Sequence, residues 1–599
     1  INGPVILEAD TTITSTGGNV DFSTTVKSDA TARDLTITSG AGTVTIHGNI
    51  GGTDTTDLDA IDINSGGGAG NITLGGDIGT SSESGATTID IGNAATATLS
   101  LDGGDYSSSG IQTFTADAFD LAGTDPTFST AGVNINFVDG GEATNLTLGD
   151  NADLEINTNL GGNAAGNISI ADNITIKGID DNNEQNVVLN AGTSTGTITV
   201  KAIGTTGGDA EINDVEMTAG GGIFLKGNIT TSTAGTVTFN SAVEITTNDV
   251  TIDTSHGSGG SVDFNSTINS TTGNAALTIN SGGGAVAIDG VIGGNADDHL
   301  DGLSINASEG SGTIALADIG ANAESGVDGG NVAIGNNTTT LITLSGEDYN
   351  VNGEILVKAT SDAGGNSSEN IKFTAGALVE VKTADDDITF SNGVIQLADA
   401  TDLTVKSEGG AIDINSIMSI ADKDTDVILN ANKTGGDLGG ETVTIGAVGS
   451  GNEIAALTIS GRDGITLQGD ITLSNAVGSD LDINGAVTID GSVTIDTDNA
   501  EATRGEATVH QDGDINFSST IDGNGGTDNL TIKAGDVAGG NPTLTFSGTI
   551  GGSEPLDALS INAGTSTMAF SLPQIGSGTA AGAGTAGVRR RPARWPGCR

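Results

Sequence analysis

The sequence predicts an all-β fold in which short parallel strands coil into an elongated β-solenoid rod; tandem β-sandwich modules are the alternative. Three observations lead to this prediction. The chain carries a long internal repeat, its apolar residues alternate with the period of a β-strand, and it is poor in aromatic residues and proline, with 3% Phe, Trp and Tyr and 7 prolines in 599 residues.

The long repeat is clearest in one phrase that occurs three times, starting at Leu35, Leu277 and Leu530. The three copies read LTITSGAGTVTIHGNIGG, LTINSGGGAVAIDGVIGG and LTIKAGDVAGGNPTLTFSGTIGG, and their starts lie 242 and 253 residues apart. The extra residues of the third copy fall in polar, Gly- and Asp-rich stretches, where surface loops tolerate insertions.

Other segments keep the same spacing, which shows that a whole unit is repeated. The chain's two tyrosines, Tyr106 and Tyr349, lie 243 residues apart in the related stretches LSLDGGDYSSSG and ITLSGEDYNVNG. We therefore expect three β-repeat units and a tail that does not belong to the fold. The expected boundaries are 1–241, 242–485, a partial unit at 486–575, and a flexible basic tail at 576–599.

A finer period runs inside each unit. Segments such as LTI, VAI and LSI recur about every 9 to 11 residues, and they are separated by SGGG, NAG and DGG, whose glycines suit tight turns. If two or three strands form one coil of ~20 to 25 residues, a unit holds roughly ten coils, each adding ~4.8 Å. Tandem β-sandwiches would need longer strands and core aromatic residues.

Composition limits the partners. The chain has 19 basic and 77 acidic residues and a net charge of -58, which disfavours nucleic acid as a partner and suits divalent cations and solubility. The single cysteine, Cys598, allows no intramolecular disulfide. No apolar run approaches the ~18 residues of a membrane-spanning helix, so we expect no transmembrane segment.

The cadence of the phrase at Leu277, together with LDGLSINA at Leu300 and LDALSINA at Leu556, resembles giant repetitive bacterial surface proteins. These are the filamentous-haemagglutinin-like exoproteins and autotransporter-type adhesins. The resemblance covers nearly all of residues 1–575 and implies secretion, a right-handed β-solenoid and a role at the cell surface. It assigns a role to no individual residue of this chain.

Acidic turns are the candidate metal sites. The stretch ADKDTD places three aspartates at alternate positions, a spacing that lets oxygen ligands converge on calcium, and the equivalent turn of the first copy, IDDNNEQN, is also acidic. An EF-hand would need Gly in place of Val427 and Glu in place of Lys433. The candidate calcium ligands, for which a solvated polar turn is the alternative, are Asp422, Asp424, Asp426, Asp180, Asp181 and Glu184.

The repeated tyrosines are the candidate contact residues. Each follows an acid, Asp105 or Asp348, so Tyr106 and Tyr349 could stack on a sugar or on a neighbouring subunit. Packing of the two rings in the core is the alternative. We predict no catalytic and no cofactor-binding residues, because the four histidines do not recur between copies, no G-x-S-x-G nucleophile elbow lies between a clear strand and a helix, and no phosphate-binding loop is present.

These observations predict a secreted bacterial structural protein at the cell surface, not an enzyme. It would form an adhesin stalk, a surface layer or an extracellular filament by self-association, with surface glycans as possible partners and calcium as a possible ligand. Two alternatives stay open: a carbohydrate-active β-helix enzyme, and a calcium-rigidified string of β-sandwich adhesin modules.

Overall fold

In the computed structural model, the chain consists of short strands that coil in parallel, and it divides into two compact units. Unit 1 comprises 1–291 and 297–300; unit 2 comprises 292–296 and 301–599. The structure describes residues 1–52, 56–80, 83–141, 144–162, 166–179, 185–205, 212–246, 249–271, 275–294, 298–321, 325–360, 370–420, 425–432, 440–450, 452–474, 480–497, 513–534, 542–562, 569–571 and 575–576. Nearly all of the predicted basic tail lies outside these residues.

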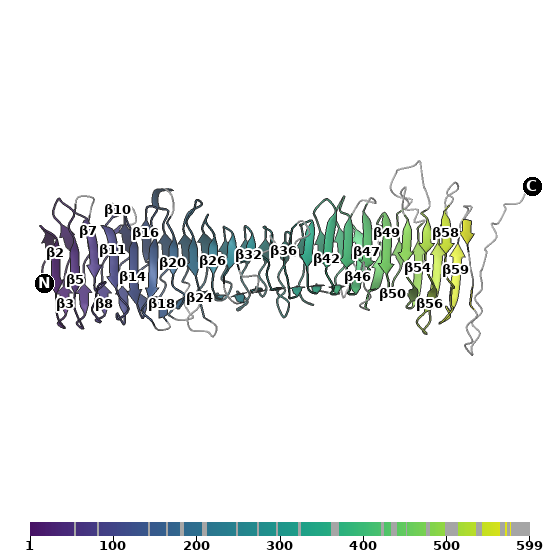
Figure 1. Cartoon of the computed structure of the whole chain (residues 1–599), viewed down its shortest axis with the longest axis horizontal. Helices are drawn as coiled ribbons and strands as arrows, with labels where there is room; N and C mark the ends of the chain where they lie inside the picture. The colour runs from purple at the N-terminus through teal and green to yellow at the C-terminus, as the bar shows by residue number, and fades with distance from the viewer. Residues whose placement is uncertain are drawn as a thin grey trace, which may run out of the picture. The chain divides into compact units, whose positions relative to one another are not determined.

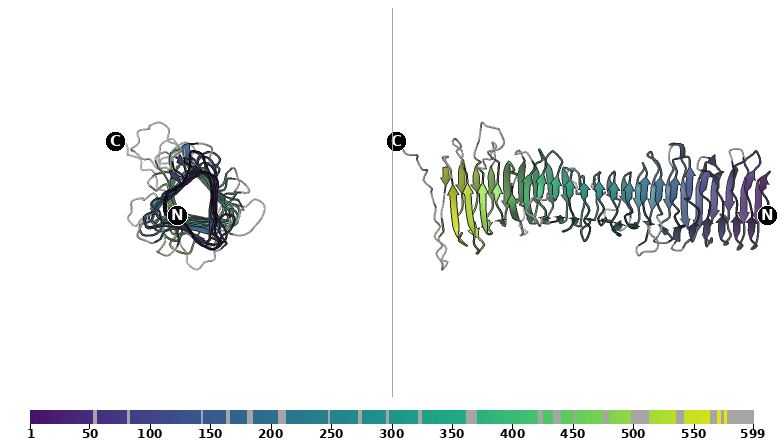
Figure 2. Two further views of the ribbon diagram at one scale, coloured as in Figure 1. Left: turned by 90° about the vertical axis from the view of Figure 1, so that its left-hand side faces the viewer. Right: turned by 180° about the vertical axis from the view of Figure 1, so that it is seen from behind.

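Unit 1 is a β-solenoid with three parallel sheets, here called sheets I, II and III, and the chain visits them in that order on every turn. Its strands stack side by side in Figure 1, and its purple coils outline a triangle end-on in Figure 2. Sheet I contains β2 (Thr11–Thr14), β5 (Leu35–Thr38), β7 (Leu58–Ile63), β11 (Ala86–Gly92), β14 (Gln112–Ala116), β17 (Ile135–Asp139), β20 (Ile168–Ile170), β23 (Ile198–Val200), β26 (Ile223–Leu225), β29 (Val243–Ile245) and β32 (Ile268–Ser270).

The other two sheets of unit 1 complete the coil. Sheet II contains β3 (Val20–Phe22), β6 (Val44–Ile46), β8 (Ile72–Leu74), β12 (Leu99–Leu101), β15 (Phe119–Leu121), β18 (Thr144–Leu148), β21 (Ile174–Lys177), β24 (Ala202–Ile203), β27 (Ile229–Thr230), β30 (Val250–Asp253) and β33 (Ala276–Asn280). Sheet III contains β1 (Val5–Leu7), β4 (Val26–Ser28), single bridges at Ile50 and Ile78, β13 (Asp105–Ser108), β16 (Thr127–Thr130), β19 (Leu154–Asn157), β22 (Val187–Asn190), β25 (Val215–Thr218), β28 (Val237–Phe239), β31 (Val262–Phe264) and β34 (Val286–Ile288). A small antiparallel pair, β9 (Gly79–Thr80) with β10 (Glu83–Ser84), and one 3-10 turn, η1 (Leu160–Gly162), project from the coil.

Unit 2 repeats this architecture with sheets IV, V and VI. Sheet IV contains β39 (Asp348–Val351), β42 (Val379–Thr383), β45 (Leu403–Ser407), β47 (Asp426–Ala431), β49 (Ala456–Gly461), β52 (Leu481–Asn484), β55 (Ile515–Phe517), β58 (Thr543–Phe546) and β60 (Ala569–Ser571). Sheet V contains β35 (Gly302–Ile305), β37 (Val332–Ile334), β40 (Ile355–Lys358), β43 (Ile388–Ser391), the first halves of β46 (Ile412–Ser419) and β48 (Thr442–Val448), β50 (Gly464–Leu467), β53 (Val487–Ile489) and β56 (Ile521–Gly523). Sheet VI contains β36 (Ile314–Leu316), β38 (Ile342–Leu344), β41 (Ile371–Phe373), β44 (Ile395–Leu397), the second halves of β46 and β48, β51 (Ile471–Thr472), β54 (Ser492–Asp496), β57 (Asn529–Lys533) and β59 (Ala558–Asn562).

Alternating burial explains why these segments form strands. In β5, Leu35 and Ile37 are fully buried while Thr36 and Thr38 face outward, and most strands of both units follow the same pattern. Period-2 alternation puts one row of side chains in the core and the next on the surface. The all-β solenoid prediction is confirmed, and the described residues contain no α-helix.

The sequence repeat does not contain a whole number of turns. Leu35 lies in β5 of sheet I, whereas its repeat equivalent Leu277 lies in β33 of sheet II. The strand after β5 is β6, and nine successive pairings along sheet II lead from β6 to β33. One repeat therefore makes nine and one-third turns, and the second copy is displaced by one face.

Unit 2 shows the same displacement in the same direction. Leu303 and Leu559 begin equivalent LSIN segments, yet they lie in sheets V and VI. Nine pairings along sheet VI separate β36, the strand after β35, from β59. These two segments lie further apart along the chain than Leu35 and Leu277 do, so the additional residues lengthen loops and leave the number of turns unchanged.

A column of glycines lets the turns stack closely at the corner between sheets I and II. A Cβ on Gly42 would lie 2.3 Å from the Gly18 carbonyl oxygen one turn below, and a Cβ on Gly70 would lie 1.7 Å from the Gly42 oxygen. The repeat equivalent of Gly42, Gly284, lies at the corner between sheets II and III and is equally close to the Gly260 carbonyl oxygen, at 2.1 Å. The third glycine of SGGG is thus required by close backbone approach, while the first, Gly282, has a positive φ of 58°.

The boundary between the first two sequence copies is not a break in the structure. Strand β28 ends before residue 241 and pairs with β31 beyond it, and β26 pairs with β29 across the same point. The sheets of unit 1 continue through the boundary, so duplication has extended one stack of turns.

Candidate functional site

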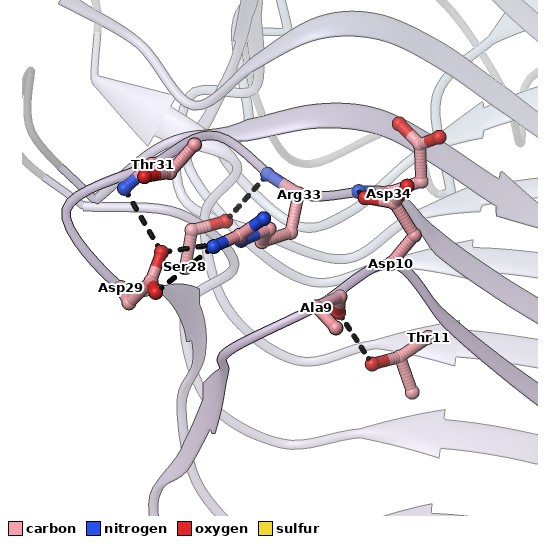
Figure 3. A network of polar contacts seen from close by, with 8 residues as sticks. All are labelled: Ala9, Asp10, Thr11, Ser28, Asp29, Thr31, Arg33 and Asp34. Atoms are coloured by element: carbon pink, nitrogen blue, oxygen red, sulfur yellow. Dashed lines mark hydrogen bonds and ion pairs between the residues drawn. The ribbon is translucent and has the colours of Figure 1, made fainter.

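Carboxylates and amides that precede strands bind the backbone of the next turn. Asp10 and Asp34 stand directly before β2 and β5, and the Asp34 backbone N–H donates to Asp10 Oδ1 at 3.3 Å (Figure 3). In the nearby turn, Arg33 donates two hydrogen bonds to Asp29, at 3.2 and 3.1 Å, and this pair lowers the pKa of the Asp29 carboxyl. These side chains shape the corners of the coil.

The same contact forms a continuous ladder at the start of the sheet III strands. In each step, the backbone N–H of one turn donates to an Asp or Asn side chain of the turn before, at distances from 2.7 to 3.2 Å. The successive residues of the ladder are Asp125, Asp153, Asn186, Asp214 and Thr236. Part of the acidic excess therefore serves the fold, because each carboxylate satisfies a backbone donor where a strand begins.

Other carboxylates lie opposite one another on the outer faces. Asp62 and Asp90 are partners on neighbouring strands of sheet I, and partial desolvation, together with the charge of Asp62, raises the pKa of Asp90. Desolvation and the charge of Asp289 likewise raise the pKa of Asp263 on sheet III. Like charges directly opposite in a sheet are destabilising, so the facing pair of Asp62 and Asp90 favours protonation or a counter-ion.

Most of the predicted calcium ligands lie outside the described residues: Asp422, Asp424, Asp180, Asp181 and Glu184. Asp426 is the first residue of β47; its side chain is exposed, and its backbone N–H donates to Asp402 Oδ1 at 2.9 Å. Within the part of the chain that the structure describes, no group of three or more His, Cys, Asp or Glu side chains is arranged to hold a metal ion. Calcium binding at these turns stays a prediction.

Both repeated tyrosines lie inside the core. Tyr106 is fully buried and stacks on Phe128 with ring centroids 4.8 Å apart; Tyr349 is 3% exposed and packs edge-on against Phe373 at 6.1 Å. Each phenol oxygen accepts a 2.9 Å hydrogen bond from a backbone N–H, that of Gly103 or Gly346. A sugar or a neighbouring subunit could reach neither ring without opening the core.

A polar pocket of about 80 Å³ lies on the outer side of sheet IV. Asn350, Lys382 and Lys406 occupy one row across the neighbouring strands β39, β42 and β45. The Nζ atoms of Lys406 and Lys382 lie 2.6 and 3.6 Å from Glu408 Oε1. The Lys406 hydrogen bond, helped by the charges of both lysines, lowers the pKa of Glu408.

Sequence reasoning missed this pocket, although a signal for it exists. The strands VEVKT and LTVKS each carry a lysine as their fourth residue, in a chain with only 19 basic residues. Strand alternation places both lysines on the outer face. Their adjacency depends on the register between turns, which the sequence does not state.

Comparison of the chain with models of known protein families, with curated proteins and with solved structures finds no match. No helix among the described residues is long and apolar enough to cross a lipid bilayer.

Proposed function

We propose that this chain is a secreted structural protein of the bacterial cell surface, in which stacked coils set the length of a stalk, layer or filament subunit. The proposal includes no catalytic role. The observation that carries it is the continuity of the sheets of unit 1 across the repeat boundary, together with the nine and one-third turns that each repeat contributes.

The additional one-third of a turn in each repeat favours a role in setting the length of the protein over a role in presenting a repeated binding surface. A binding surface copied on one face would need a whole number of turns per repeat, so that every copy pointed the same way. Here equivalent strands such as β5 and β33 lie on different sheets. Each added copy of the kind seen in unit 1 adds about 45 Å at ~4.8 Å per turn. The resemblance of the repeated sequence segments to those of repetitive bacterial surface exoproteins supports a location outside the cell.

A deletion tests the role of the repeat in length. Removing residues 35–276 joins Asp34 to Leu277, which is the repeat equivalent of Leu35, so the strand pattern continues. We expect a folded particle shorter by about 45 Å in electron micrographs. Removing residues 35–277 instead is the matched control, because it also deletes the buried Leu277 and either reverses the joined strand or puts Asp34 in the core, so this variant should have a clearly lower thermal midpoint. A folded 35–276 deletion of unchanged length would contradict the proposal.

Location is tested on intact cells of the source bacterium. Antibody against the chain should label the outer surface, and added protease should remove the label without lysing the cells. Label that appears only after lysis would overturn the proposed location.

A carbohydrate-active enzyme is the second candidate, favoured by the pocket that Lys382 and Glu408 line, with Lys406 paired to Glu408 beside it. Incubation with a panel of acidic polysaccharides tests this candidate. Cleavage of a polysaccharide by the unmodified protein, and its loss in the variant Glu408→Gln, would support catalysis. If the full-length protein cleaves none of these polysaccharides, the structural role is the better explanation.

A further inference from the structure

The row of Asn350, Lys382 and Lys406 is unusual in a strongly acidic protein. Two lysines face each other as Cα partners on adjacent strands, where like charges repel. One Glu408 oxygen accepts both ammonium groups, which leaves the cluster with one excess positive charge and with N–H donors that this oxygen does not use. These spare ammonium N–H groups can bind an anionic group that enters the pocket, although Asp348 and Glu380 lie one outward position earlier on β39 and β42.

Asn350 provides the second, independent observation. Its side chain is 4% exposed, and neither Nδ2 nor Oδ1 has a hydrogen-bond partner among the residues that the structure describes. Buried amides are almost always paired, so an amide with both atoms unpaired marks a place where a partner is missing. Asn350 lines the pocket together with Lys382, Glu408 and the hydroxyl-bearing Ser325.

The unpaired atoms define the ligand chemistry. Nδ2 needs an acceptor and Oδ1 needs a donor, while the lysines require negative charge. One molecule satisfies all three when it carries an anionic group beside a hydroxyl. We propose that this pocket binds an anionic saccharide, with the acidic group at the lysines and a hydroxyl at the Asn350 amide. The pocket of about 80 Å³ admits such a group and excludes a whole sugar ring, so the rest of the saccharide lies over sheet IV.

The first copy lacks this chemistry, which makes the site specific to the second. Ser107 follows Tyr106 as Asn350 follows Tyr349, and it is also buried, but its partner on the next strand is Ser129 where Asn350 faces Lys382. Duplication thus supplied the buried position, and lysines on the neighbouring turns supplied the charge. The proposal does not depend on the structural role argued above.

Calorimetric titration of the full chain with glucuronate and with glucose 6-sulfate tests the site, with glucose as the uncharged probe. We expect heat with at least one anionic sugar and none with glucose, and a loss of affinity of tenfold or more in Asn350→Leu and in Lys382→Met. Preference for one of the two sugars identifies a carboxylate or a sulfate as the natural group.

The thermal midpoint separates a binding role from a structural one. Asn350→Leu removes an unpaired buried amide, so its midpoint should stay equal or rise while binding is lost. Lys533→Met, which breaks the 3.0 Å pair with Asp496 on sheet VI, is the matched control and should bind normally. Absence of heat with both anionic sugars, or unchanged affinity in both pocket variants, would overturn the proposal. So would binding of glucose as tight as that of the charged sugars.

Discussion

Leu35 and Leu277 begin two copies of one phrase and lie on different faces of the same unit, Leu35 in sheet I and Leu277 in sheet II. The displacement arises because the chain makes nine and one-third turns between them. Side chains that are identical in the sequence repeat thus point in directions that differ by one face. The duplicated chain extends the stack and distributes each copy's surface around it.

Cross-linking tests the register between turns. Thr45 and Thr73 are Cα partners on β6 and β8, and both face outward. With Cys598 replaced by Ser, we expect Thr45→Cys with Thr73→Cys to form a disulfide under mild oxidation, because neighbouring strands lie within disulfide range. Thr45→Cys with Asp62→Cys is the control: Asp62 lies on sheet I, so this pair should stay reduced. Equal oxidation of both pairs would contradict the register.

The tyrosine hydroxyls should stabilise the two units similarly. Tyr106→Phe and Tyr349→Phe each remove the acceptor for a buried backbone N–H, so we expect a loss of about 1–3 kcal/mol in each case. Hydrogen exchange at Gly103 and Gly346 measures the local effect, which suits a repeat protein better than one global unfolding curve. Unchanged exchange at both amides would show that the hydrogen bonds contribute nothing.

Close stacking should make Gly42 intolerant of any side chain. In Gly42→Ala the new Cβ would meet the Gly18 backbone, and the turns would have to separate. We expect a clear drop in the thermal midpoint, measured by circular dichroism. Gly66→Ala is the matched control, because no described residue lies within 4 Å of a Cβ there and its φ is not in the left-handed region. Equal midpoints for the two variants would contradict the stacking.

Acidification should stabilise sheet I at the facing pair of Asp62 and Asp90. The pKa of Asp90 is raised in the folded state, so its protonated form is favoured by folding. This contribution is complete below the ordinary aspartate pKa of about 3.9 and is lost as pH rises through the folded value. Asp90→Asn should therefore raise the thermal midpoint at pH 7 and leave it unchanged at low pH. Asp29→Asn, at a carboxyl whose pKa is lowered, should give no such gain at pH 7.

Calcium at the acidic turns is tested by titration of the full chain. If Asp422, Asp424 and Asp426 hold the ion, calcium should release or absorb heat and raise the thermal midpoint. Replacing Asp424 by Asn should weaken both effects. If millimolar calcium gives no binding heat and no change in the thermal midpoint, the prediction of a calcium site is wrong.

Much of the fold could be predicted because each strand carries its own pattern. Alternating burial in segments such as Leu35–Thr38, glycine at corners and few aromatic residues together predict a solenoid, and the structure confirms it. The role of Asp10 and its counterparts could not be predicted, because an acid before a strand is expected to be a solvated turn residue until the backbone N–H of the next turn is placed beside it. The packing of Tyr106 on Phe128 also depends on residues one turn apart.

The sequence by itself determined the strands, their inward and outward sides and the length of the repeat, because these depend on spacing along the chain. Only the tertiary structure decided which turns are neighbours. Loop lengths vary, so some turns of unit 1 are short, as between the partners Ile223 and Val243, and others are much longer, as between Ile135 and Ile168. Because of that variation, the spacing of residues along the chain does not give the number of turns in a repeat, and only the register between turns brings Asn350, Lys382 and Lys406 into one row.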